Sequence, residues 1–166
     1  MENNQLISLE QQFGEVIDII LQHKSNASRV VNEELLLSAW HVGGYVYAKL
    51  KSEEWGSKVV TQLSEYIRSK RPDIKGYSRS SIYNMVMFYD EYSSDAFNIT
   101  LKKYITTEFL QTLSGQLIKP IKSFPKILEL TTLSNHIEIL CRCKSNEERL
   151  FYILYANKER LVFREL

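Results

Sequence analysis

The sequence has 166 residues, of which 44% are hydrophobic and 25% are charged, and its formal net charge is +1. A chain of this length and composition can bury a core as one compact globular domain. Its near-neutral charge excludes a polycationic nucleic-acid coat, so any nucleic-acid binding must come from a local basic patch. The sequence shows neither a signal-peptide pattern at its start nor a long uncharged apolar window. We therefore expect a cytoplasmic protein with no membrane partner.

Two amphipathic helices are predicted first. The earlier one takes residues 1–24, where apolar residues recur at helical spacing. Residues 23–31 are expected to interrupt it, and Asn32 is expected to cap the second helix. The inner face of that second helix is formed by Leu36, Trp40, Gly43, Tyr47 and Leu50. Gly43 and Gly44 each cost about 1 kcal/mol relative to Ala in a helix, so we expect either close approach of another helix there or a kink.

Residues 55–92 are predicted to form a helix–turn–helix, around which the rest of the chain is organised. Pro72 ends its first helix, Gly76 supplies a bend, and Ser78 caps its second helix. The apolar face of the first helix is formed by Val59, Val60, Leu63 and Ile67. The buried stripe of the second is formed by Ile82, Met85, Val86 and Tyr89. Its opposite face carries Arg79, Ser80, Tyr83, Asn84 and Met87.

Positive charge is concentrated in this helical pair, since residues 57–84 hold six basic residues and only two acidic ones. A phosphate-binding surface requires such a concentration. The candidate phosphate ligands are Lys58, Arg68, Lys70, Arg71 and Lys75. The candidate residues for base or backbone contact are Ser78, Arg79, Ser80, Tyr83 and Asn84. The alternative interpretation is an ordinary helical hairpin whose charged face is simply solvated.

Residues 93–131 are rich in Ser, Thr and Pro and are expected to be irregular, with a small β-wing between 95 and 130 as an alternative. Residues 133–157 are predicted to form a C-terminal helical hairpin. Ser134 is the expected N-cap of its first helix, and Ser145-Asn-Glu-Glu148 fits a capping box at the second. The predicted fold class is therefore mainly α, a single domain with a helix–turn–helix or winged-helix-like core.

No catalytic constellation is evident. Cys141 and Cys143 are interpreted as packing residues rather than metal or redox ligands, and His41 and His136 as packing or hydrogen-bonding residues. Pro72-Asp73-Ile74-Lys75 is similar to a piece of a metal-dependent nuclease motif, yet it lacks a second acidic residue on a strand. We therefore expect no enzymatic activity from this chain by itself, and no metal or other cofactor.

Several ordered motifs resemble the N-terminal domain of the YhcG-like family. In the first block they are Asn32-Glu-Glu-Leu-Leu-Leu37, Trp40-His-Val-Gly43, Trp55-Gly56-Ser57-Lys58-Val59, Leu63-Ser64 and Gly76-Tyr77-Ser78-Arg79-Ser80-Ser81-Ile82-Tyr83-Asn84-Met85. In the second they are Leu133-Ser-Asn-His136, Glu147-Glu-Arg-Leu-Phe-Tyr152 and Arg164-Glu165-Leu166. The resemblance implies a bacterial DNA-binding domain with a helix–turn–helix or winged-helix-like arrangement. It also implies a fused PD-(D/E)xK nuclease-like domain and a role in defence or mobile-element biology.

Two departures from the family pattern shape what we expect of partners. The sequence stops where the family's linking helix begins, so a nuclease domain or subunit is expected downstream. The family's Arg-Arg-Asn-like run is replaced by Arg79-Ser80-Ser81, which removes one cation. The expected partner is double-stranded DNA. The alternative function is a protein-interaction or dimerisation module whose aromatic faces make the contact, and a homodimer is compatible with both.

Overall fold

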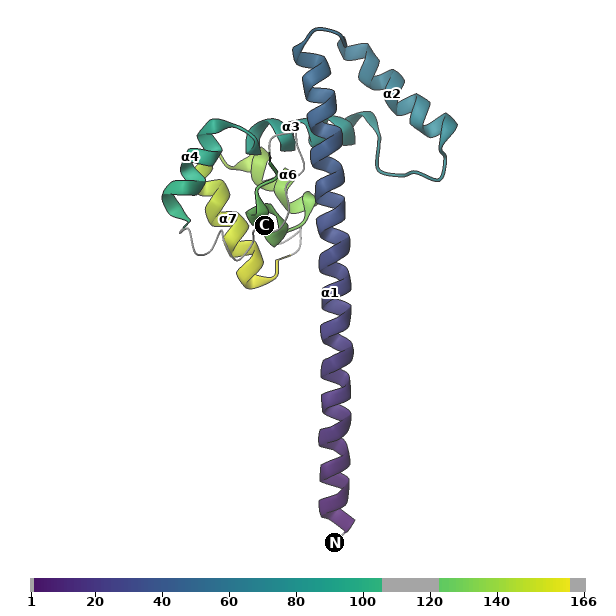
Figure 1. Ribbon diagram of the computed structural model, residues 1–166, viewed down its shortest axis with the longest axis vertical. Coiled ribbons are helices and arrows are strands. Elements are labelled where there is room, and N and C mark those ends of the chain that lie inside the picture. The colour runs from purple at the N-terminus through teal and green to yellow at the C-terminus, as the bar shows by residue number, and fades with distance from the viewer. Residues whose placement is uncertain (1, 106–122, 162–166) are drawn as a thin grey trace. The chain divides into compact units, whose positions relative to one another are not determined.

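The computed structural model describes residues 2–105 and 123–161, and it describes side chains from residue 27 onward. Its elements are the helices α1 (Glu2–Lys51), α2 (Ser57–Lys70), α3 (Arg79–Tyr92) and α4 (Asp95–Tyr104), the 3₁₀ helix η1 (Lys126–Leu130), and the helices α6 (Leu133–Arg142) and α7 (Asn146–Glu159) (Figure 1). No strand occurs within the described ranges. The mainly α prediction is confirmed, whereas a winged-helix core is not.

The chain divides into two compact units, Met1–Glu34 and Leu35–Leu166. The first unit is helical through the segment that we expected to interrupt it, so the predicted end near residue 24 is wrong. Asn32 lies inside α1 and does not cap a new helix. The physical reason is that residues 23–31 contain neither Gly nor Pro. Their Ser and Asn residues lower helix propensity by less than 1 kcal/mol each, roughly, which does not break a helix.

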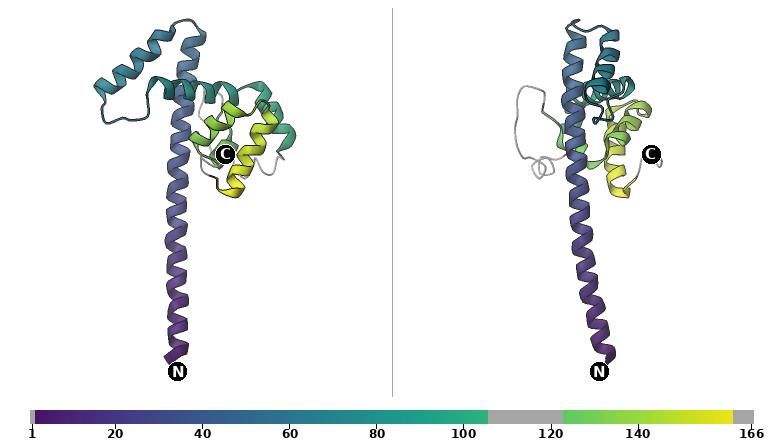
Figure 2. Two further views of the ribbon diagram at one scale, coloured as in Figure 1. Left: turned by 180° about the vertical axis from the view of Figure 1, so that it is seen from behind. Right: turned by 90° about the vertical axis from the view of Figure 1, so that its right-hand side faces the viewer.

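Helix α3 and the last turns of α1 are the central elements of the second unit, because each contributes to both of its hydrophobic clusters. The larger cluster joins α3 to α4, η1, α6, α7 and the last turns of α1. Figure 2 shows α4, α6 and α7 grouped together beside α3. Its largest fully buried side chains are Trp40, Phe88, Tyr92 and Phe97. The rings of Trp40 and Phe88 meet edge to face, with centroids 5.9 Å apart, a favoured arrangement for aromatic pairs.

The smaller cluster holds α2 in place. Val46 of α1, Val60 of α2 and Ile82 of α3 are each at most 1% exposed and pack together. The predicted apolar face of α2 is therefore confirmed at Val60, and Leu63 packs against the same cluster. The predicted stripe of α3 is confirmed at Ile82, Met85 and Tyr89, which are buried. Phe88 and Tyr92 are buried residues of α3 that the prediction did not include.

Helices α1 and α3 cross at Gly43. A Cβ atom built on Gly43 would lie only 2.0 Å from the carbonyl oxygen of Met85. At Gly44 it would lie 2.8 Å from the Tyr89 ring. Of the two explanations for these glycines, the structure therefore supports close approach of another helix.

The connection between α2 and α3 confirms two predictions and differs in one respect. Helix α2 ends at Lys70, just before Pro72, and the hydroxyl of Ser78 accepts a hydrogen bond from Ser81 as the N-cap of α3. Residues 71–78 separate the helices, with Gly76 at a φ of 89°. Such a connection is longer than the 3–4 residues usual in helix–turn–helix motifs.

Two further predictions need correction. Residues 95–104 are helical, because Ser94 caps α4 by accepting a hydrogen bond from the Phe97 amide, so the irregular segment or wing predicted there is wrong. The remainder of that prediction falls mostly on residues 106–122, outside the described residues. Helix α6 is capped by Thr132 rather than by Ser134. The capping box of α7, formed by Ser145 and Glu148, is confirmed.

Candidate nucleic-acid interface

The first turns of α3 present polar side chains to solvent. Arg79, Ser80 and Asn84 are exposed, and Tyr83 is half-buried against the smaller cluster. The guanidinium of Arg79 lies 5.2 Å from the centre of the Tyr83 ring, a cation–π distance. Because the Tyr83 ring restrains it, this guanidinium is partly pre-organised for contact with a ligand.

Ser78 has a structural role in the same turn. Its hydroxyl oxygen accepts from the Ser81 amide at 3.2 Å and lies 3.1 Å and 2.8 Å from the hydroxyls of Ser80 and Ser81. The Ser78 hydroxyl is thus engaged in capping α3. Of the predicted contact residues, Arg79, Ser80 and Asn84 are exposed on α3, whereas the side chain of Ser78 caps the helix.

The predicted phosphate ligands fall into two groups. Lys58, Arg68, Lys70 and Lys75 are exposed and form no ion pair within the described part of the chain. Arg71 instead donates two hydrogen bonds to Asp73, at 3.0 Å and 2.7 Å. This pairing lowers the pKa of the Asp73 carboxyl below its ordinary value. Arg71 thus differs from the other four cations in having a carboxylate partner, a difference that helical periodicity does not indicate.

Two cavities flank the turn that joins α2 and α3. One of about 360 Å³ lies between α3 and α6, where Ser81 and Asn84 face Ser134. The other, of about 240 Å³, lies between the last turns of α2 and the turn itself, and both Arg68 and Lys75 line it. Two of the predicted cations therefore share one concave site.

A third cavity is almost entirely apolar. It has a volume of about 350 Å³ and lies between the last turns of α1 and helix α2. Its walls include the aromatic residues Tyr45, Trp55 and Tyr77. His41 lines it as an exposed residue. This surface has the character of a site for apolar side chains of a protein partner.

His136 is a core residue. Its Nε2 donates to the Leu128 carbonyl at 2.8 Å, and its Nδ1 accepts from the Tyr92 hydroxyl at 3.2 Å. The Leu128 carbonyl can only accept, so Nε2 carries a proton, and in the neutral ring Nδ1 is then the acceptor. Complete burial lowers the pKa of His136 to about 4. The packing interpretation of His136 is confirmed.

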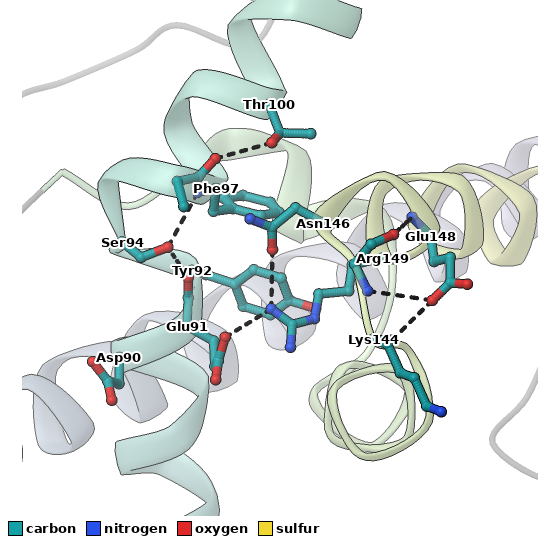
Figure 3. Close-up of polar contacts among 12 residues, drawn as sticks. Asp90, Glu91, Tyr92, Ser94, Phe97, Thr100, Lys144, Asn146, Glu148 and Arg149 are labelled. Atoms are coloured by element: carbon teal, nitrogen blue, oxygen red, sulfur yellow. Dashed lines mark hydrogen bonds and ion pairs between the residues drawn. The ribbon is translucent and has the colours of Figure 1, made fainter.

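A polar contact that our sequence reading did not anticipate joins α7 to α3. Arg149 donates to Glu91 at 2.7 Å and to the side-chain oxygen of Asn146 at 3.0 Å, and Figure 3 shows its guanidinium between these two residues. The Arg149 side chain is only 13% exposed. Because 58 positions separate Arg149 from Glu91, no local spacing indicates this pair.

The described residues contain no cluster of three or more side chains suited to hold a metal ion. Cys141 is exposed and Cys143 is half-buried, and burial raises the pKa of the Cys143 thiol. None of the helices in the described ranges combines the length and apolarity that a bilayer span requires.

A known protein family matches most of the chain. The model of a family described as the DUF1016 N-terminal domain matches residues 15–166. No curated protein and no solved structure matches the chain. The match extends over α2, α3 and the helical hairpin of α6 and α7.

Proposed function

The chain belongs to the DUF1016 N-terminal domain family, the YhcG-like family that its motifs resemble, and we propose that its α2–α3 surface binds double-stranded DNA. The observation that carries this proposal is the set of exposed cations without carboxylate partners on α2 and in the turn that leads to α3. Cations already paired within a protein lose much of their attraction for phosphate. Lys58, Arg68, Lys70 and Lys75 retain it.

The proposed division of labour follows from side-chain chemistry. The exposed lysines and Arg68 hold phosphates, which fixes position without reading sequence. Arg79 and Asn84 contact base edges or the backbone, since Arg and Asn make the bidentate contacts that discriminate bases by about 1–3 kcal/mol. The module is non-catalytic by itself and directs a nuclease domain or subunit to DNA.

Titration of a labelled duplex at two salt concentrations tests this proposal. We expect the affinity of the unmodified chain to fall steeply with salt, because cations that bind phosphates displace counterions. The double substitution Arg79→Ala, Lys75→Ala should weaken binding by about ten-fold or more. It should also reduce the slope of the logarithm of the binding constant against the logarithm of the salt concentration by about one, for the lost phosphate contact.

Lys102→Ala is the matched control, since Lys102 is an exposed lysine on α4. It should leave the duplex affinity unchanged. Equal affinities of the double variant and the unmodified chain would rule out the proposed α2–α3 surface.

A second candidate function, protein interaction or dimerisation, is favoured by exposed aromatic residues on α7. The rings of Phe151 and Tyr155 stack at 5.8 Å with an interplanar angle of 8°. Phe151 is nevertheless 58% exposed and Tyr155 is 42% exposed. Exposed aromatic side chains of this kind are typical anchors of protein interfaces. A tight dimer in sedimentation, together with no salt-dependent DNA binding, would favour this function over the first.

A further inference from the structure

The cavity between α2 and the following turn has the composition of an anion site. Its polar lining comes from Ser64, Arg68, Lys75, Gly76 and Ser78, and the remainder is mostly apolar. Of the described residues that line it, none is acidic. The two cations come from different elements, the last turns of α2 and the connecting turn, so they approach the cavity from separate directions.

Three of the polar side chains around this cavity are available to a ligand, whereas the Ser78 hydroxyl is engaged in capping α3. Neither Arg68 nor Lys75 forms an ion pair with any described residue, and the Ser64 hydroxyl forms no hydrogen bond with one. The nearest carboxylate in the turn, Asp73, is held by the two hydrogen bonds from Arg71. Asp73 is therefore paired with Arg71 and does not line the cavity.

The backbone adds to the positive potential of this site. Ser78, which lines the cavity, is the N-cap of the 14-residue helix α3, and the N-terminus of a helix carries a partial positive charge. Gly76 has a φ of 89°, and a Cβ on it would meet no atom within 4 Å. The wall beside Gly76 is consequently open to a ligand.

From these features we infer that the cavity lined by Arg68, Lys75 and Ser64 binds a phosphate group. An Arg guanidinium supplies paired donors and a Lys ammonium supplies a point charge, a combination suited to phosphate oxygens. The cavity has a volume of about 240 Å³, far more than the roughly 10–15 Å³ that a single water requires. That space accommodates a phosphate group with part of its hydration.

The inference rests on the proposed function for the source of the phosphate, which is DNA. Two sources share this chemistry, the phosphodiester of the backbone and the 5′-phosphate at a duplex end. In both cases Arg68 and Lys75 contact the same phosphate group. Arg79 and Asn84 contact other parts of the duplex.

The first arm of the test uses inorganic phosphate and the full chain. Phosphate is titrated into isotopically labelled protein at constant ionic strength, with chloride as the reference anion, and amide shifts are followed by NMR. We expect saturable shifts at Lys75, Gly76 and Ser78. Arg68→Ala and Lys75→Ala should each weaken phosphate binding by about ten-fold, because each removes a charge-assisted contact.

Lys102→Ala again serves as the matched control and should bind phosphate like the unmodified chain. Thermal unfolding of each variant verifies that it is folded, as expected for exposed side chains. Shifts no larger than those caused by chloride, or unchanged phosphate affinity in both Arg68→Ala and Lys75→Ala, would overturn the inference.

The second arm compares duplexes that carry a 5′-phosphate or a 5′-hydroxyl. Tighter binding of the phosphorylated duplex, lost in Lys75→Ala, assigns the cavity to a DNA end. Equal binding of both duplexes, weakened alike in Lys75→Ala, assigns it to the backbone. If inorganic phosphate occupies the cavity and neither duplex binds, the DNA-binding function fails while the phosphate site remains.

Discussion

His136 illustrates how a single buried side chain makes the stability of this protein depend on pH. Its ring is neutral in the folded state, and the pKa is about 4 there, against an ordinary value of 6.5 in an exposed histidine. Protonation is therefore easier in the unfolded state. The contribution of this residue to stability is complete above pH 6.5 and is lost as the pH falls towards 4.

We expect this linkage to reduce the free energy of unfolding by about 3 kcal/mol between pH 7 and pH 4, beyond any change due to carboxylates. Urea unfolding at several pH values measures it. The comparison is with His136→Gln, which lacks the ionisable ring. That variant is expected to be less stable at neutral pH, because the bonds to Leu128 and Tyr92 are altered, but to lose less stability on acidification. If the free energy of unfolding of both proteins fell by the same amount between pH 7 and pH 4, this account would be contradicted.

The basic residues show the limit of sequence reading at the scale of single residues. Arg71 and Lys75 both lie in the turn after α2 and look equivalent as phosphate ligands in the sequence. The structure separates them, because Arg71 is paired with Asp73 and Lys75 lines a cavity. Exposure of Arg79 and Asn84 could be predicted from helical periodicity. Side-chain pairing within a turn depends on its conformation, which periodicity does not define.

Among the helices, the crossing of α1 and α3 is the contact most sensitive to one added atom. The methyl group of Gly43→Ala would lie 2.0 Å from a backbone oxygen, and backbone cannot move aside as a flexible side chain can. Overpacking of this kind costs roughly 1–3 kcal/mol, occasionally more. It opposes the gain of about 1 kcal/mol in helix propensity.

We therefore expect Gly43→Ala to lower the free energy of unfolding by about 2 kcal/mol, measured by urea or thermal unfolding. Gly56→Ser is the matched control, since Gly56 is the N-cap of α2 and a Cβ there meets nothing within 4 Å. Serine is a good N-cap residue, so this variant should be as stable as the unmodified chain or slightly more so. A Gly43→Ala protein of unchanged stability would show that the helices do not approach as closely as described.

Helix boundaries could be predicted where a residue acts through its own backbone. Pro72 ends α2, and Ser78 and Ser145 cap α3 and α7, as expected. Prediction failed where the sequence offers weaker signals. Ser and Thr are common between residues 93 and 131, and we interpreted them as loop formers, whereas Ser94 caps a helix. Thr132 and Ser134 are both competent caps, and local sequence does not decide between them.

In the second unit as a whole, the helical content could be predicted but the partners of each helix could not. The pair Arg149 and Glu91 and the burial of His136 beside Leu128 and Tyr92 depend on which helices meet. Such contacts arise from the tertiary packing of the whole unit. The residues of the candidate surface lie within one stretch of sequence, 57–84, so their helices and the connecting turn could be predicted, whereas their binding of DNA stays a prediction.

The position of α3 in both hydrophobic clusters links ligand binding to the thermal stability of the second unit. Ile82 anchors this helix to α2, and Phe88 and Tyr92 anchor it to α6 and its neighbours. Loosening α3 would expose both sets of side chains together, so the second unit should melt cooperatively. A phosphate or duplex held at the first turn of α3 should therefore raise the melting temperature of the whole unit, as a single transition in a thermal-shift assay.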